Sequence, residues 1–188
     1  MNDILIIGAG PAGASAALFA SKAGKKTVVI DNDKSLTKRA WIENHYGVTE
    51  ISGPNLIDVG KEQAKKFGAE IISASVNKVE KTENGFQVET DEKGSFEAKH
   101  IIFASGVSLQ VAEAFGVETK AGTEPRINTV LHTDAEGKTN IPGIWAAGTC
   151  AGVSVHTIIT AGDGAKVAIN IISELNGERY VDHDLLKK

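Results

Sequence analysis

The sequence contains only one cysteine, Cys150, among its 188 residues. A single cysteine excludes an internal disulfide, a redox-active Cys-x-x-Cys pair and a cysteine-based zinc site. This cysteine usage is typical of a reduced, intracellular protein, and we expect a cytoplasmic location. The histidines show no ligand spacing, so we predict no metal site and interpret them as ordinary loop or surface residues: His45, His100, His132 and His183.

Long apolar runs and an excess of positive charge are also missing. No run of about 18 apolar residues occurs, so no membrane span is predicted. The N-terminal apolar stretch lacks a basic flank and carries Asp3, which excludes a signal peptide. A net charge of −4 and a pI near 5.7 argue against nucleic-acid binding. The scattered lysines are interpreted as solvated helix surface: Lys22, Lys25, Lys26, Lys61, Lys65 and Lys66.

The remaining pattern alternates short apolar runs with longer amphipathic segments. The apolar runs at residues 4–7 and 27–30 predict buried strands of a parallel sheet, and an alanine-rich helix over 14–23 separates them. Gly24 and Gly68 are helix C-terminal signals. Further strands are predicted at residues 71–72, 100–104 and 144–147, and further helices at 54–67 and 155–175.

The middle of the chain has a different period. Phe86, Val88 and Thr90 alternate with polar residues, and turn signals occur at 84–85 and 93–94. These features predict an antiparallel meander of three strands over residues 75–99. Residues 32–52 and 107–140 are predicted to be loop-rich, with a short strand near Ile127.

A glycine-rich turn lies between the first predicted strand and helix. Residues 8–13 read GAGPAG and fit G-x-G-x-x-G, whose glycines permit a tight turn, a close pyrophosphate and close helix–strand packing. The N-terminus of the predicted helix that follows the turn would stabilise the negative pyrophosphate, because its free N–H groups and its dipole favour an anion. Asp31 ends the second strand, near the position where an acid accepts hydrogen bonds from an adenosine ribose. An acid there disfavours a 2′-phosphate, so the residues suit FAD or NAD without choosing between them.

Later segments of the sequence favour FAD over NAD, because they resemble a known family. A strand ending in Ala104-Ser105-Gly106 and the stretch IPGIWAAG at residues 141–148 follow the glycine turn, Asp31 and the meander in this order. The chain therefore resembles thioredoxin-reductase-like, FAD-dependent pyridine nucleotide-disulfide oxidoreductases. Residues 43–47, 53–54 and 63–70 are also similar to that family. The resemblance implies an α/β, Rossmann-like FAD/NAD(P)-binding domain with a parallel sheet, flanking helices and the three-stranded meander.

The resemblance also assigns roles to individual residues. The glycine turn would hold the FAD pyrophosphate, Asp31 the adenosine ribose, and the backbone of Val76 the adenine. Arg39 and Asn44 would line the cofactor, and the last helix would direct its positive end at the flavin pyrimidine ring. The implied cofactor-binding residues are Gly8, Gly10, Pro11, Ala12, Gly13, Asp31, Arg39, Asn44, Val76, Ala104, Ser105, Gly106, Gly148, Thr149, His156 and Thr157.

Two parts of the family pattern are missing. The family inserts a nicotinamide domain after the position of Gly106, but residues 107–140 leave no room for a Rossmann-type domain of ~100–150 residues. No second G-x-G-x-x-G occurs. We therefore predict one FAD-binding domain over 1–188, with 1–106 and 141–188 matching the two halves of the family's flavin domain. A reductase reaction would then need a separate NAD(P)H-binding or dithiol-carrying protein, and family members are commonly homodimers.

The residues beside the predicted flavin leave two functions open. Thr149 replaces the family aspartate that binds the ribityl chain, so we expect weaker FAD retention. Cys150 is either an inert buried residue or a thiol near the flavin. The other flavin-site motifs are intact, which favours an FAD-dependent oxidoreductase, or a subunit of one. It would not be a self-sufficient thioredoxin reductase. The alternative is a non-catalytic flavin or dinucleotide sensor or carrier.

Overall fold

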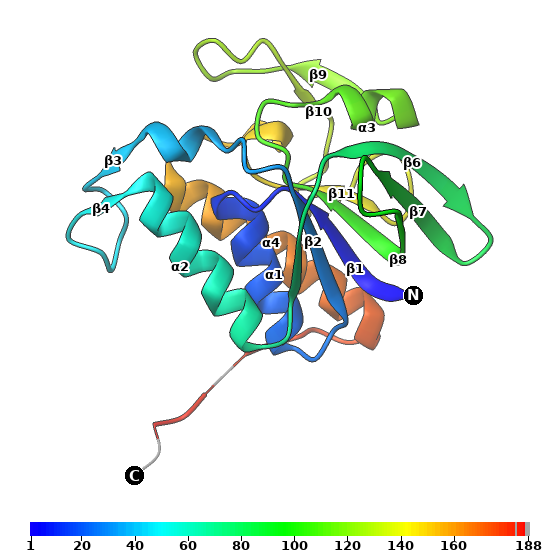
Figure 1. The fold of residues 1–188 in the computed structure, drawn as a ribbon, viewed down its shortest axis with the longest axis horizontal. Helices are drawn as coiled ribbons and strands as arrows, with labels where there is room; N and C mark the ends of the chain where they lie inside the picture. The colour runs from blue at the N-terminus through cyan, green and yellow to red at the C-terminus, as the bar shows by residue number, and fades with distance from the viewer. Residues whose placement is uncertain (183, 187–188) are drawn as a thin grey trace.

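A computed structural model describes residues 1–182 and 184–186, so the interpretation of His183 lies outside the described residues. A seven-stranded sheet forms its centre (Figure 1). The strands β1 (Asn2–Ile7), β2 (Thr27–Asp31) and β5 (Glu70–Ser73) pair in parallel, with Ile6 opposite Val29 and Val29 opposite Ile71. The predicted parallel sheet is therefore confirmed.

The meander extends the same sheet. Strand β6 (Val76–Thr82) pairs antiparallel with β7 (Gly85–Thr90), and β7 pairs antiparallel with the first half of β8 (Ser95–Phe103). The second half of β8 lies parallel to β1 and to β11 (Ile144–Ala146). The last meander strand and the predicted strand over 100–104 are thus one strand, because β8 changes partners along its length without a break.

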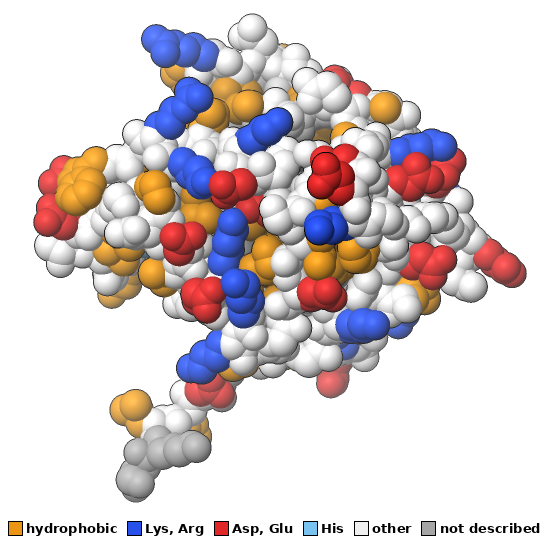
Figure 2. All heavy atoms as spheres, viewed as in Figure 1, with side chains coloured by type: hydrophobic (Ala, Val, Ile, Leu, Met, Phe, Trp, Pro, Cys, Tyr) orange, Lys and Arg blue, Asp and Glu red, His pale blue; other side chains and the backbone are white. Residues whose placement is uncertain are grey.

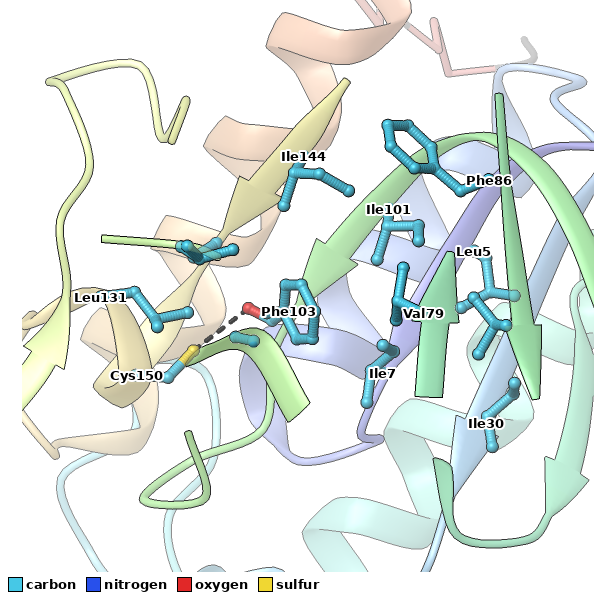
Figure 3. Close-up of a cluster of buried hydrophobic side chains, with 14 of the residues drawn as sticks. Leu5, Ile7, Ile30, Val79, Phe86, Ile101, Phe103, Leu131, Ile144 and Cys150 are labelled. Atoms are coloured by element: carbon cyan, nitrogen blue, oxygen red, sulfur yellow. Dashed lines mark hydrogen bonds between the residues drawn. The ribbon is translucent and has the colours of Figure 1, made fainter. Parts of the chain in front are cut away.

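Side chains of β1 alternate between two apolar clusters. Ile4 and Ile6 face helices α1 (Pro11–Lys22) and α4 (Thr157–Asn176), and helix α2 (Gly53–Lys66) packs against α1. Leu5 and Ile7 face the opposite cluster, which includes Phe86 of the meander, Phe103 and Leu131 (Figure 3). The period of two along the strand thus buries both faces of the sheet.

Segments predicted to be loop-rich contain short elements. Residues 32–52 form the 3-10 helix η1 (Leu36–Arg39) and the strand pair β3 (Trp41–Ile42) and β4 (Ile51–Ser52). Beyond β8 the chain forms α3 (Gln110–Phe115) and the antiparallel pair β9 (Thr119–Ala121) and β10 (Thr129–Leu131). The 3-10 turn η2 (Gly148–Ala151) follows β11. These elements lie at the end of the sheet where β1, β2 and β8 finish (Figure 1).

Candidate functional site

The glycine turn that joins β1 to α1 is held tightly by its own backbone. Gly8 has a φ of +102°, and a Cβ there would lie 2.5 Å from the Ala104 carbonyl oxygen. A Cβ on Gly13 would lie 1.9 Å from the Gly8 carbonyl oxygen. Helix α1 begins at Pro11, so the amides of Ala12 and Gly13 have no acceptor within the helix. The turn therefore presents free donors and a positive helix end to an anion.

Asp31 lies beside this turn at the end of β2. Its Oδ1 accepts a hydrogen bond from the Ala9 amide at 3.2 Å, and the residue is only 6% exposed. The parallel pairing of Ile7 with Ile30 brings the ends of β1 and β2 together, which places an acid next to the glycine turn. This is the geometry in which an acid contacts an adenosine ribose while the turn holds a phosphate.

A cavity of about 430 Å³ runs over the carboxyl ends of the strands from Asp31 towards α4. Its lining comes from β1, β2, β8 and the segments that follow β11, as expected for a ligand crevice in an open α/β sheet. The predicted residues that line it are Gly8, Gly10, Pro11, Ala12, Asp31, Val76, Ala104, Ser105, Gly106, Thr149 and Thr157.

The other predicted site residues lie outside this lining. Gly13 packs under the turn against Gly8, and Gly148 supports Thr149 from the preceding position. Arg39 in η1 and Asn44 in the following loop are exposed, and His156 is the exposed N-cap residue of α4. The structure therefore does not bring Arg39, Asn44 or His156 into the cavity wall, and their contact with a cofactor stays a prediction.

Several lining residues were not anticipated from the sequence. The loop after Asp31 contributes polar groups, and the segments beyond β8 contribute apolar ones. The first group has a sequence signal, because this loop directly follows Asp31 at the end of β2. The second group depends on how the chain beyond β8 folds back. The unanticipated residues include Lys34, Ser35, Thr37, Val107, Val111, Ile127, Val155 and Thr160.

The lining of the cavity matches the two chemical parts of FAD. The glycine turn and Asp31 suit a pyrophosphate and an adenosine ribose. Apolar side chains line other parts of its wall: Val107 and Val111 beyond β8, Ile127 before β10, and Val155 before α4. Small-molecule sites combine such apolar walls with a few placed polar groups. The residues present therefore fit FAD.

The turn after β11 is fixed by a carboxylate on α4. Asp163 Oδ2 accepts a hydrogen bond from the Gly148 amide at 2.7 Å, and Asp163 Oδ1 is 2.7 Å from Lys166 Nζ. The Asp163 side chain is 8% exposed and lies outside the lining of the main cavity. It orients the segment that carries Thr149.

Cys150 faces the core rather than the cavity. It is 1% exposed, and its Sγ lies 3.1 Å from the carbonyl oxygen of Phe103 (Figure 3) and 3.2 Å from that of Ala147, which share its single S–H donor. Burial raises the pKa of the thiol to about 11. A buried, protonated thiol is a poor nucleophile. Of the two interpretations of this residue, the environment favours the inert one.

One histidine is not the ordinary loop or surface residue that the sequence predicted. His100 lies within β8 and its Nδ1 accepts a hydrogen bond from Trp145 Nε1 at 3.2 Å; burial lowers its pKa. His45 does lie in a loop, but its Nδ1 is 3.0 Å from the hydroxyl oxygen of Thr157, a cavity residue, and burial lowers its pKa as well. Both contacts arise because strand pairing and loop packing place polar partners that are distant in sequence.

Positive and negative side chains are mixed on the surface. Figure 2 shows Lys and Arg side chains interspersed with Asp and Glu over the face that contains α2. Lys61 departs from the predicted solvated lysines: its side chain is 17% exposed and its Nζ lies 2.6 Å from Asp31 Oδ2. Among residues 1–182 and 184–186, no helix is long and apolar enough to cross a membrane. The same residues contain no group of three or more Asp, Glu, His or Cys side chains that could hold a metal ion.

Two protein-family models match the sequence. The sequence model of the pyridine nucleotide-disulphide oxidoreductase family matches residues 40–165, and that of the FAD binding domain matches residues 3–40. Thioredoxin reductase of Aquifex aeolicus is 38% identical over 124 residues, which cover 64% of this chain and 38% of that protein. Thioredoxin reductase of Rickettsia felis is 39% identical over 113 residues, 58% of this chain and 36% of that protein. The chain thus spans less than two fifths of these relatives.

Solved structures agree with the fold. A thioredoxin reductase from Gloeobacter violaceus superimposes with a TM-score of 0.78 at 19% identity, over 99% of both chains. An oxidoreductase from Agrobacterium tumefaciens gives 0.79 at 15% identity, over 94% of this chain and 99% of that one. The predicted Rossmann-like flavoprotein fold is confirmed, and the sequence matches indicate FAD as the cofactor. The chain belongs to the pyridine nucleotide-disulphide oxidoreductase family of FAD-dependent oxidoreductases.

Proposed function

We propose that this chain is the flavin-binding half of a thioredoxin-reductase-like oxidoreductase. It would take electrons from an external reductant or from NAD(P)H held by another protein, and pass them to an acceptor. The observation that supports this most is a single cavity whose wall combines the glycine turn and Asp31 with apolar residues such as Ile127. Bound FAD would supply the hydride and electron chemistry, while the protein supplies binding and electrostatics.

The proposed roles of the chain's residues follow from their positions. The first-turn amides of α1 would hold the pyrophosphate, and Asp31 would accept hydrogen bonds from the ribose hydroxyls. Val155, just before α4, lines the cavity and is about half exposed, at 51%. Electrons would leave across this exposed part of the wall, where a reductant or partner could approach. A separate NAD(P)H-binding or dithiol-carrying protein, and a homodimer, belong to the same proposal.

A reductive titration tests this function. Purified protein reconstituted with FAD should show flavin absorbance bands, and anaerobic NADH or NADPH should bleach them, alone or with a partner extract. Gly10→Ala is the matched variant, because its Cβ would meet only the Ser35 side chain, with the hydroxyl oxygen at 3.2 Å, and both residues line the cavity. It should keep the fold and lose FAD binding. Absence of bleaching at millimolar nicotinamide under every condition would overturn the oxidoreductase.

A non-catalytic flavin sensor or carrier is the second candidate. Two observations favour it: no cysteine or histidine is among the described residues lining the cavity, and Thr149 stands where the family has an aspartate. This candidate would be supported over the first by two results together. The protein would bind FAD and change conformation on binding, and neither nicotinamides nor partner proteins reduced beforehand with dithionite would reduce the bound flavin.

A further inference from the structure

Lys61 reaches the acid that ends β2 from the neighbouring helix. Its Nζ lies 2.6 Å from Asp31 Oδ2 and 3.7 Å from Asp33 Oδ1. Burial disfavours the charged form of Lys61. The hydrogen bond to Asp31 and the attraction of its charge outweigh the effect of burial, so the pKa of Lys61 is raised. Asp33 is also paired with Lys38, so Lys61 is the cation committed to Asp31. The pair is a charge-assisted hydrogen bond that is largely shielded from solvent.

The reach of Lys61 depends on how closely two helices pack. Gly60 precedes it on α2, and a Cβ there would lie 3.0 Å from the Cβ of Ala14 on α1. A larger residue at position 60 would move α2 away from α1 and carry the Lys61 ammonium group away from β2. The small residues at this helix crossing therefore position a cation at the carboxyl end of the sheet.

The two oxygens of Asp31 are held from opposite directions. Oδ1 accepts from the Ala9 amide in the glycine turn, and Oδ2 accepts from Lys61. A carboxylate has about four acceptor sites, so about two remain for the hydroxyls of a ribose. Lys61 also neutralises a carboxylate that would otherwise stand unpaired beside the negative pyrophosphate.

We propose that Lys61 is a positioning residue for adenosine-ribose recognition: it fixes and neutralises Asp31, so that the site selects nucleotides with an intact ribose diol. This inference rests on the proposed dinucleotide site. It predicts that Lys61 contributes to binding only through Asp31 and only when the ligand carries the ribose hydroxyls.

The test measures binding of FAD, ADP and 2′-deoxy-ADP to the full chain by calorimetry. Lys61→Met should weaken FAD and ADP binding about tenfold, the loss typical of one charge-assisted hydrogen bond, and 2′-deoxy-ADP binding less than about threefold. Lys61→Arg should bind ADP like wild type. Lys65→Met is the matched control, because Lys65 lies on the same helix, is 49% exposed and pairs with Glu62; it should change nothing.

A double-mutant cycle separates positioning from a general structural effect. In the Asp31→Asn background, Lys61→Met should have no further effect on ADP affinity. Equal losses for ADP and 2′-deoxy-ADP, additive losses in the cycle, or tighter binding by Lys61→Met would overturn the role of Lys61. If Lys61→Met does not fold, Lys61→Gln is measured in the same way. A wild type that binds neither FAD nor ADP would instead overturn the proposed function, and this inference with it.

Discussion

A Cβ on Gly164 of α4 would lie 2.0 Å from the carbonyl oxygen of Ala12 in the first turn of α1. The two helices therefore touch backbone to backbone directly beneath the glycine turn. This contact sets the position of the free amides that the proposed pyrophosphate site uses, because any side chain at position 164 would separate α4 from α1.

Gly164→Ala should destabilise the protein by about 3 kcal/mol, since the helices must move apart to relieve the overlap. Urea denaturation followed by circular dichroism measures this loss. Gly162→Ala is the matched control on the same helix, because a Cβ there meets nothing within 4 Å. The control should gain about 0.5–1 kcal/mol from helix propensity. Equal effects at both positions would contradict the close contact.

Thr149→Asp should strengthen FAD binding. The side chain lines the cavity, and a carboxylate adds charge and a second acceptor for the ribityl hydroxyls. We expect the Kd for FAD to fall about tenfold, measured by quenching of flavin fluorescence. Thr149→Val, which removes the hydroxyl at nearly constant volume, should raise the Kd. An aspartate variant that binds more weakly than the valine variant would contradict this prediction.

Cys150 should be unreactive in the folded protein. At pH 8 a thiol with a pKa of about 11 has roughly a hundredfold less thiolate than one with the ordinary value of 9.0. Native protein should therefore react slowly with a chromogenic disulfide, and protein unfolded in guanidinium should react rapidly. Cys150→Ala should also leave reduction of bound flavin by nicotinamides unchanged. Loss of that reduction in the alanine variant would restore the thiol as a catalytic candidate.

Stability should depend on the protonation of His100. Its Nδ1 accepts the Trp145 hydrogen bond only while the ring is neutral, and burial lowers its folded pKa below 6.5. Because the unfolded chain then binds the proton more tightly, this contribution is present above pH 6.5 and is lost as the pH falls through the folded pKa. We expect a loss of about 1 kcal/mol. Urea denaturation at pH values from about 4.5 to 7.5 covers the ordinary histidine pKa of about 6.5. Over this range, His100→Gln should make the free energy of unfolding less dependent on pH.

The sequence by itself determined the parallel strands, the main helices and the chemical identity of the glycine turn and Asp31. Those features depend on local rules: buried strands are continuous apolar runs, and glycines in this spacing permit one kind of turn. The replacement of the family aspartate by Thr149 was also visible in the sequence, because it is a matter of residue type.

Tertiary structure decided what each of these residues touches. Lys61 and His100 looked like surface residues, yet helix packing and strand pairing gave them the partners Asp31 and Trp145. Ile127 and Val155 line the cavity because the chain beyond β8 folds back over the strand ends. The continuity of β8 was equally hidden, since it depends on a change of partner strands. Such contacts join residues far apart in sequence, so no local pattern encodes them.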